Sequence, residues 1–350
     1  MTDQPAQTRT GEELNKEALS AYLRNQLAIA GEISIQQFPS GYSNLTYLIQ
    51  SGNGEFVLRR PPLGANIKSA HDMAREFNVL ASLRKAGYQR CPEPILLCED
   101  GSVIGAKFYL MRRMKGVILR NRVPKNLSIE PATFQALSKS AIDQLVHLHQ
   151  LDLHSSGLGE LGKPEGYIQR QVEGWTKRYE NSQTDEIVSL NETSEWMKKN
   201  LPASSAVAFI HNDFKYDNLV LDPNDLTRVL GVLDWEMATV GDPLMDLGTT
   251  LAYWAEANDS EALKPFNLTW MPGNLTRQEV LNYYQEKSEK SIDSITFYYA
   301  FGSFKVAVIC QQIYFRYKKG ITQDPRFASL IQVIKACGEN ARKAITNLKI

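Results

Sequence analysis

One stretch of the chain places residue types that phosphoryl transfer from a nucleotide requires. Segment 211–218 reads His-Asn-Asp-Phe-Lys-Tyr-Asp-Asn, and Asp234 follows further along the chain. Asp213 can accept a proton from an attacking hydroxyl, and Lys215 can neutralise charge on the moving phosphoryl group. Asn218 and Asp234 can hold magnesium on the phosphates of the nucleotide. We therefore predict Asp213 and Lys215 as catalytic residues, and Asn218 and Asp234 as magnesium ligands.

Short apolar strands are expected around this loop. Residues 207–210 run into it, residues 219–221 follow it, and residues 229–233 lead to Asp234. The sequence Asp-Pro-Asn-Asp at 222–225 is typical of a turn. This order predicts a catalytic loop followed by a hairpin that delivers Asp234. The alternative is that these carboxylates only serve turns and caps.

Further motifs accompany the loop and its hairpin. They are Gly-Tyr-Ser-Asn-Leu-Thr-Tyr at 41–47, Leu-Arg-Arg-Pro-Pro at 58–62, Arg170-Gln171 with Trp175, Leu-Asp-Trp-Glu at 233–236 and Gly-Asp-Pro-Leu-Met-Asp-Leu at 241–247. The loop resembles the protein-kinase catalytic loop, H-R-D-L-x-x-x-N. Over roughly residues 30–320 the chain resembles the aminoglycoside phosphotransferase family, the small-molecule branch of the protein-kinase-like fold. It looks closer still to a subgroup, the kinase-like N-terminal part of fused acyl-CoA dehydrogenases.

The order of predicted elements matches an α+β, two-lobe, protein-kinase-like fold. A helix is expected at 14–30 and another, beginning at Ser69, at 69–86; strands are expected at 33–38, 45–49, 56–59, 95–98 and 107–111. Later helices are expected at 134–150, 167–180, 185–200, 247–256, 276–287, 294–318 and 325–348. We predict an N-terminal nucleotide-binding lobe at 1–111, built from an antiparallel sheet with one helix, whose residues 1–12 are flexible. Residues 112–350 are predicted to form the hinge and a mainly helical C-terminal lobe with the catalytic loop and the acceptor site.

A kinase covers the nucleotide phosphates with backbone amides. The candidate loop has one glycine instead of three, so the family resemblance, more than the spacing, implies this role. An ordinary hairpin turn is the alternative. The loop residues predicted to bind nucleotide are Ser40, Gly41, Tyr42, Ser43 and Asn44.

A kinase also pins the phosphates with a cation held by a helix carboxylate. Glu76 falls within an apolar helical stripe, so it should be partly buried and should have a cationic partner. Arg59 is the first candidate and Arg60 the alternative; either one departs from the lysine of protein kinases. If Glu76 instead lies on the solvated flank of the helix, no such pair is needed. Met111 begins the hinge and is predicted to contact the nucleotide.

Other residues are expected to support the site or to contact the acceptor. We interpret His211 as a brace of the loop, and Asp242 and Asp246 as buried caps that tie the loop to the helical lobe. Gln171 and Trp175 share a helix face, which borders the acceptor cleft in the resembling subgroup. Three residues are therefore candidate acceptor contacts: Gln171, Trp175 and Glu236. An aromatic at helical spacing is also typical of a core, and Glu236 could equally be structural.

Composition narrows the class of protein. The chain has 350 residues, a formal net charge of +0 and 4 cysteines without Cys-x-x-Cys spacing. These features argue against wholesale nucleic-acid binding and against a zinc site. The most apolar run, 300–315, is interrupted by Lys305, so no membrane span is predicted. With no signal peptide visible, we expect a cytoplasmic protein with reduced thiols; the oligomeric state cannot be read from the sequence.

These observations predict a kinase that moves the γ-phosphoryl group of ATP or GTP, with Mg²⁺, to a hydroxyl of a small molecule. The subgroup resemblance implies a metabolic acceptor such as a hydroxylated acyl thioester. An aminoglycoside kinase is one alternative, although the C-terminal helices show no strong acidic bias for a polycation. A nucleotide-binding module without chemistry is another, and adenylyl transfer is a third.

Overall fold

The computed structural model describes residues 5–39, 44–62, 72–124, 127–203, 206–348 and 350. The chain divides into two compact units, each described here by itself. Unit 1 comprises Met1–Ile118, Val220–Asn224 and Leu230–Glu236. Unit 2 comprises Leu119–Leu219, Asp225–Val229 and Met237–Ile350.

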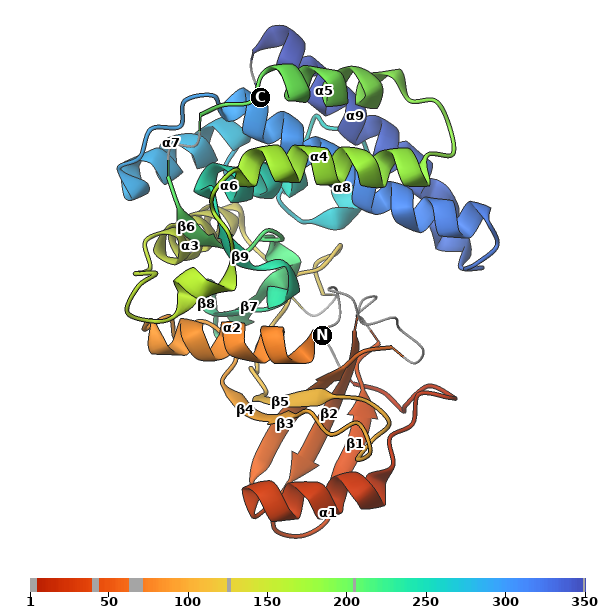
Figure 1. The fold of residues 1–350 in the computed structure, drawn as a ribbon. Helices are drawn as coiled ribbons and strands as arrows, with labels where there is room; N and C mark the ends of the chain where they lie inside the picture. The colour runs from red at the N-terminus through yellow and green to blue at the C-terminus, as the bar shows by residue number, and fades with distance from the viewer. Residues whose placement is uncertain (1–4, 40–43, 63–71, 125–126, 204–205, 349) are drawn as a thin grey trace. The chain divides into compact units, whose positions relative to one another are not determined.

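Unit 1 is built on an antiparallel sheet with the strand order β1-β2-β3-β5-β4 among the described residues (Figure 1). The strands are β1 (Ser34–Gln37), β2 (Leu45–Ser51), β3 (Gly54–Arg60), β4 (Pro94–Cys98) and β5 (Phe108–Arg112). Two helices join them, α1 (Lys16–Leu27) and α2 (Met73–Lys85). β2 and β3 form a tight hairpin that turns at Gly54, whose φ is 118°, a conformation that favours glycine.

The alternation of side chains along β3 decides which residues face α2. Successive residues of a strand point to opposite faces of a sheet. Leu58 and its cross-strand partner Leu110 join the core that Leu19 of α1 covers. Arg59 and its partner Tyr109 therefore point to the opposite face, on the side of α2, which packs against β4 and β5. The sheet register thus directs Arg59 toward a helix that carries Glu76.

Unit 2 is mostly helical. Its α-helices are α3 (Pro131–His149), α4 (Tyr167–Ser182), α5 (Val188–Lys199), α6 (Pro243–Tyr253), α7 (Arg277–Ser288), α8 (Ile295–Lys318) and α9 (Leu330–Asn347). Short 3-10 turns are η1 (Leu158–Leu161), η2 (Tyr216–Asn218), η4 (Lys264–Phe266) and η5 (Pro325–Ser329), while η3 (Trp235–Met237) follows Asp234. Its strands are β6 (Ala208–Ile210) and β9 (Thr239–Gly241), while β7 (Leu219–Asp222) and β8 (Asp225–Val232) contain residues of both units. β6 pairs with β9, and β7 pairs with β8.

Several boundaries differ from the sequence-based expectations. α2 begins at Met73 and is capped by Asp72, whose side chain accepts a hydrogen bond from the Arg75 amide at 3.0 Å. Ser69, the expected start, lies outside the described residues. The strand β9 had no signal in the sequence, because three residues are too few for a visible alternation. α9 begins only at Leu330, after the proline-led turn η5.

Helices α6 and α8 touch at two glycines. A Cβ atom on Gly302 of α8 would lie 2.2 Å from the carbonyl oxygen of Gly248 on α6. A Cβ on Gly248 would lie equally close, at 2.2 Å, to the carbonyl oxygen of Tyr298. Only glycine permits such a backbone approach. Asp246 and Lys305 lie within one turn of this contact, so the contact sets where both side chains point.

Enlarging Gly302 should therefore destabilise the protein. We expect Gly302→Ala to lower the free energy of unfolding by about 1–3 kcal/mol, because the backbones of α6 and α8 must move apart to make room for the added methyl group. Chemical denaturation monitored by circular dichroism measures this. Gly174→Ala on α4 is the matched control, since its new Cβ would meet the end of the Arg178 side chain at 3.3 Å. A Gly302→Ala protein as stable as the Gly174→Ala control would contradict the close-contact interpretation.

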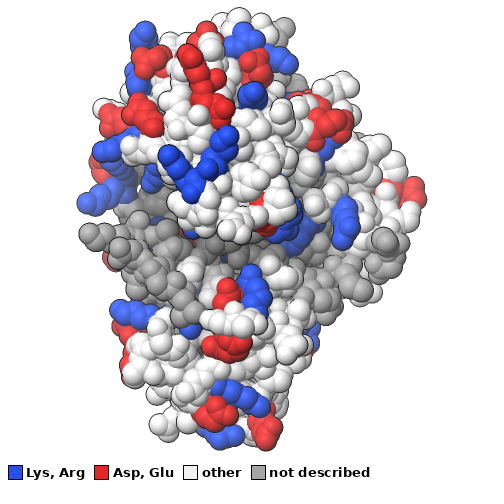
Figure 2. Space-filling model, turned by 90° about the vertical axis from the view of Figure 1, so that its right-hand side faces the viewer, with Lys and Arg blue, Asp and Glu red and all other residues white. Residues whose placement is uncertain are grey.

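The distribution of charged, apolar and cysteine residues can be compared with the composition of the chain. Figure 2 shows basic and acidic side chains interspersed on the face that it draws, which agrees with a formal net charge of +0. Within the part of the chain that the structure describes, no helix is both long enough and apolar enough to cross a bilayer. All of the cysteines, Cys91, Cys98, Cys310 and Cys337, are buried free thiols.

Candidate active site

The predicted catalytic loop of unit 2 begins with a strained turn. β6 ends at Ile210, and Asn212 then adopts a φ of 67°, in the left-handed region that non-glycine residues rarely occupy. Such conformations cost free energy and persist only where surrounding contacts hold them. This turn redirects the chain so that Asp213 follows directly after it.

Asp246 of α6 holds this turn from the amide side. Its carboxylate accepts hydrogen bonds from the backbone amides of His211 at 2.6 Å and Asn212 at 2.8 Å. His149 of α3 contacts the same carboxylate at 3.2 Å and is in turn bonded to Tyr284 at 2.8 Å. Burial would raise the pKa of Asp246, but its contacts with His149 and His211 together outweigh burial and lower it. Asp246 is thus an ionised, fully buried anchor of the loop.

The two other predicted supports also lie in unit 2. Asp242 caps α6, because its side chain accepts a hydrogen bond from the Leu244 amide at 2.8 Å. Tyr298 of α8 donates to its second oxygen at 3.3 Å. His211 accepts a hydrogen bond from the Asp213 amide through Nδ1 at 3.2 Å. Its ring therefore contacts the loop backbone, as a brace would.

Asp213 and Lys215 form a close ion pair. Lys215 Nζ lies 2.6 Å from Asp213 Oδ2, and both side chains are largely buried. Burial would raise the pKa of Asp213, yet the neighbouring Lys215 lowers it below the usual value. Burial would likewise lower the pKa of Lys215, but Asp213 raises it well above the usual value. Asp213 is therefore an anion near neutral pH, poised to accept a hydrogen bond from a hydroxyl.

Asn218 closes the loop back onto Asp213. Its side-chain nitrogen donates to the Asp213 carbonyl at 2.8 Å and to Asp213 Oδ2 at 3.2 Å. Because the amide nitrogen makes these bonds, the amide oxygen is the atom that could contact a cation. Asp213, Lys215 and Asn218 thus form one hydrogen-bonded group.

A second cluster lies in unit 1 and centres on Arg59. Arg59 Nε lies 3.3 Å from Glu76 Oε2, and its Nη2 lies 3.5 Å from Asp234 Oδ1 and 3.4 Å from Glu236 Oε2. Although burial lowers it, the surrounding carboxylates, Glu76 foremost, raise the pKa of Arg59 well above its usual value. Of the two arginines proposed from the sequence, Arg59 is the one that pairs with Glu76. Arg60 instead donates to the Ile104 carbonyl at 3.0 Å.

Glu76 is buried and fully engaged. Asn44 donates to its Oε1 at 2.8 Å, and Tyr109 donates to its Oε2 at 2.9 Å. Burial raises the pKa of Glu76 despite the opposing effect of Arg59. The alternative that Glu76 lies on a solvated flank is therefore wrong. The Glu76 side chain orients Arg59, as the carboxylate of a kinase small lobe would.

The segment Asp234-Trp235-Glu236 reaches the same cluster. Asp234 has a φ of 66°, and its Oδ1 is a buried oxygen to which no described residue donates a hydrogen bond. Glu236 accepts a hydrogen bond from Asn44 at 3.2 Å, and its carbonyl accepts one from Arg75 at 3.2 Å. Glu236 thus contacts the Arg59 cluster.

The remaining predicted site residues are less informative. Ser40, Gly41, Tyr42 and Ser43 lie outside the described residues. Met111 is buried in β5, opposite Val57 of β3. No group of three or more His, Cys, Asp or Glu side chains suited to hold a metal occurs among the described residues.

The predicted acceptor residues Gln171 and Trp175 contact each other on α4. Trp175 Nε1 donates to Gln171 Oε1 at 3.2 Å, and the indole is largely buried. The Arg178 guanidinium lies 4.8 Å from the centre of this ring, and Lys305 Nζ lies 5.7 Å from it. Trp175 therefore contacts two cations in unit 2.

Sequence reasoning missed several contributors to these clusters. They are Tyr109, His149, Asn212, Tyr253 and Lys305. Lys215 stacks over the Tyr253 ring at 4.7 Å. The one feature of the sequence that could have revealed such a residue is a charged side chain within an apolar helical run, as at Lys305.

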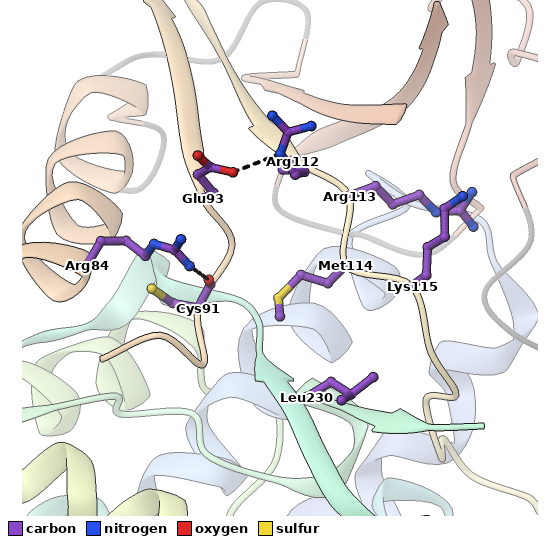
Figure 3. Close-up of a pocket in the computed structure, with 8 residues that line it drawn as sticks. All are labelled: Arg84, Cys91, Glu93, Arg112, Arg113, Met114, Lys115 and Leu230. Atoms are coloured by element: carbon purple, nitrogen blue, oxygen red, sulfur yellow. Dashed lines mark hydrogen bonds and ion pairs between the residues drawn. The ribbon is translucent and has the colours of Figure 1, made fainter. Parts of the chain in front are cut away.

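A separate pocket of about 310 Å³ lies in unit 1, where the segment after β5 meets the end of α2 (Figure 3). Four basic side chains line it, but most are already paired. Arg112 contacts Glu93 at 2.8 Å, and Arg113 and Lys115 contact Glu55 at 2.8 and 3.1 Å. The nucleotide-binding residues predicted from the sequence are not among those that line this pocket.

Comparison with known proteins decides the family. The model of the phosphotransferase enzyme family matches residues 34–277, more than half of the chain. The chain belongs to this family. The predicted resemblance is confirmed, and so is the phosphotransferase class of the enzyme, with a hydroxyl group of a small molecule as acceptor.

Relatives of this phosphotransferase include parts of larger proteins. Acyl-CoA dehydrogenase family member 11 of Gallus gallus is 36% identical over 317 residues, which are 89% of this chain and 40% of that protein. Acyl-CoA dehydrogenase family member 10 of Mus musculus is 34% identical over 306 residues, 86% of this chain and 28% of that protein. The phosphotransferase chain thus spans less than half of the length of these relatives.

Solved structures confirm the protein-kinase-like fold of this phosphotransferase. A candidate aminoglycoside phosphotransferase from Ralstonia eutropha has a TM-score of 0.81 and 29% identity, covering 96% of this chain and 99% of its own. A choline kinase from Cryptosporidium parvum has a TM-score of 0.67 at 11% identity, covering 95% of this chain and 97% of its own. At such low identity the second likeness concerns the fold alone.

Proposed function

We propose that this phosphotransferase moves the γ-phosphoryl group of ATP or GTP to the hydroxyl of a small metabolic molecule, with Mg²⁺ on the nucleotide. In this reaction Asp213 orients the acceptor hydroxyl and takes its proton. Lys215 neutralises charge on the phosphoryl group. Arg59, oriented by Glu76, binds phosphate oxygens. The solved spectinomycin phosphotransferase of the same fold is a complex with ADP and spectinomycin, which supports a nucleotide co-substrate.

The observation that carries the proposal is the Asp213–Lys215–Asn218 group. A buried carboxylate with a lowered pKa is a weak base toward a free alcohol. Phosphoryl transfer passes through a loose transition state, in which positioning and charge neutralisation matter more than early proton removal. An ionised Asp213 beside Lys215, at 2.6 Å, suits that requirement.

The residues present also suit magnesium. Mg²⁺ is bound in phosphoryl-transfer sites by one or two protein oxygens together with phosphates and water. The side chain of Asp234 is 38% exposed; its Oδ1 lies 3.5 Å from Arg59 Nη2 and accepts no hydrogen bond from the described residues. From the sequence we propose the Asn218 amide oxygen as a second ligand. When bound, the cation neutralises phosphate charge.

Removing the Asp234 charge should weaken nucleotide binding. We expect Asp234→Asn to raise the dissociation constant of Mg-ATP roughly tenfold or more, because perturbing metal coordination typically costs 10–100-fold in affinity. Isothermal titration calorimetry measures this with and without Mg²⁺. Asp225→Asn, at the exposed start of β8, is the control. Equal Mg-ATP affinity for both variants would remove Asp234 from the proposed metal site.

For the acceptor we propose a hydroxylated acyl thioester. The relatives are named acyl-CoA dehydrogenase family members, and this chain matches 40% or less of the two described above. Lys215 and Lys305 also both lower the pKa of Asp213, so positive charge lies near this carboxylate. Such surroundings suit an anionic acceptor better than a polycation.

An acceptor screen tests the proposal. Purified protein is mixed with Mg-ATP or Mg-GTP and with hydroxyacyl-CoAs, hydroxy acids, sugars, choline or aminoglycosides, and nucleoside diphosphate release is followed. Mass spectrometry of the product distinguishes an added phosphoryl group from an adenylyl group. We expect phosphorylated hydroxyacyl-CoA. Phosphorylation of aminoglycosides alone would replace the acceptor assignment, and Mg-ATP binding without any product would favour a non-catalytic module.

A further inference from the structure

A buried lysine in unit 2 has been described so far only as a positive charge near Asp213. Lys305 lies in the middle of α8, and its neighbours along this helix are almost all apolar. Only 1% of the residue is exposed to solvent. Burying an ammonium group costs several kcal/mol unless polar groups receive it. The contacts of Lys305 should therefore reveal what the charge is for.

Lys305 contacts the catalytic loop at the peptide that precedes Asp213. Its Nζ donates a hydrogen bond to the Asn212 carbonyl at 2.6 Å and lies 3.5 Å from the Asn212 side-chain oxygen. Nζ also lies 5.7 Å from the centre of the Trp175 ring, within the range of a cation–π contact. The ammonium is thus satisfied by a carbonyl and a ring.

The strained turn is consequently held from two sides. Asp246 of α6 accepts hydrogen bonds from the amides of His211 and Asn212, and Lys305 of α8 donates to the carbonyl of Asn212. A residue with a φ of 67° needs such contacts to persist. The glycine contact between α6 and α8 fixes both anchors relative to each other. The anchors carry opposite charges, which match the partial charges of the groups they bind.

The electrostatic setting of Lys305 involves charged groups of the catalytic loop, α6 and α4. Burial lowers its pKa to about 8, against the opposing effects of Asp213 and Asp246. Lys215 of the same loop and Arg178 of α4 lower it further. Lys305 in turn contributes to the lowered pKa of Asp213.

We propose that Lys305 is a positioning residue of the phosphoryl transfer: it holds the Asn212–Asp213 peptide in the turn and keeps a positive charge behind Asp213. This inference rests on the proposed function. It assigns to α8 a direct part in orienting the loop. Trp175, whose ring contacts both Lys305 and Arg178, then packs against the buried ammonium, which accounts for the burial of the indole.

The test compares Lys305→Met with Lys318→Met, an exposed lysine at the end of the same helix. We expect Lys305→Met to lower kcat on the order of 10–100-fold, because small misplacements of a catalytic group have effects of this size. The KM for Mg-ATP should stay unchanged. Wild-type kcat should fall as the pH rises through about 8, since Lys305 loses its proton there. The Lys305→Met profile should lack that fall.

Hydrogen exchange of the segment around Asn212 gives a readout that needs no acceptor. In Lys305→Met its amides should exchange faster than in Lys318→Met. Unchanged exchange or unchanged kcat in Lys305→Met overturns the inference. If the wild type phosphorylates no acceptor, the proposed function fails, and hydrogen exchange alone decides the positioning role. If Lys305→Met does not fold, Lys305→Arg is used, and a retained fall of its kcat near pH 8 overturns the inference.

Discussion

Asp213→Asn is expected to lower kcat for phosphoryl transfer at least about 100-fold, since a positioned acid–base group typically contributes about 10²–10⁴-fold. The substitution keeps the size of the side chain. It removes the negative charge that the acceptor hydroxyl requires as a hydrogen-bond and proton acceptor. It also releases Lys215, which lies 2.6 Å from the Asp213 carboxylate.

Nucleotide binding should survive this change, because Asp213 is proposed to contact the acceptor and not the phosphates. The measurement pairs steady-state kinetics on the acceptor found in the screen with calorimetric titration of Mg-ATP. Asp225→Asn again serves as the control for the chemical change alone. An Asp213→Asn enzyme with wild-type kcat would refute the proposed mechanism, whereas lost Mg-ATP binding would place Asp213 in the nucleotide site.

Asp246→Ala is expected to destabilise the protein by about 2–6 kcal/mol, since each buried amide left without its acceptor costs about 1–3 kcal/mol. The Asp246 carboxylate is fully buried and accepts bonds from two amides and His149. Without it, the amides of His211 and Asn212 lose their partners, and the strained turn loses one anchor. Phosphoryl transfer should fall with it, because Asp213 follows that turn.

The pH dependence of stability gives this prediction a second readout. The pKa of Asp246 is lowered in the folded protein, so its contribution is fully present above its ordinary pKa of 3.8. The contribution is lost as the pH falls through the lower folded value. The stability difference between wild type and Asp246→Ala should therefore be constant near neutral pH and shrink below about pH 4.

Denaturant titrations at several pH values measure both effects. Asp143→Ala is the control, since Asp143 is an exposed residue of α3 bonded to Tyr283 at 2.9 Å. Its change should stay within about 0.5 kcal/mol. A similar small change for Asp246→Ala would show that Asp246 does not anchor the loop.

Much of the fold was predictable because its signals are local. Helical stripes and apolar strands alternate along the chain, and the resulting α+β, protein-kinase-like fold is confirmed by the solved structures. The ends of helices and strands were harder to predict. Caps such as Asp72 and short strands such as β9 depend on tertiary contacts with other parts of the chain. The roles of Asp213, Lys215, Asn218 and Asp234 remain predictions.

The sequence by itself determined the class of chemistry. Asp213, Lys215 and Asn218 lie within one loop, so their spacing limits how far apart their side chains can be, and the structure joins them by hydrogen bonds. Short-range spacing of this kind can be read directly from the chain. Asp234 could also be found from a local signal, because it directly follows an apolar strand.

Only the tertiary structure decided what holds these residues in place. Lys305 reaches Asn212 because two glycines let α6 and α8 touch, and Arg59 faces Glu76 because the register of β3 directs it there. Each contact joins residues far apart in sequence, whose meeting depends on the packing of whole helices and sheets. A buried charge in a helix suggests that a partner exists, but only the packed fold determines which residue it is.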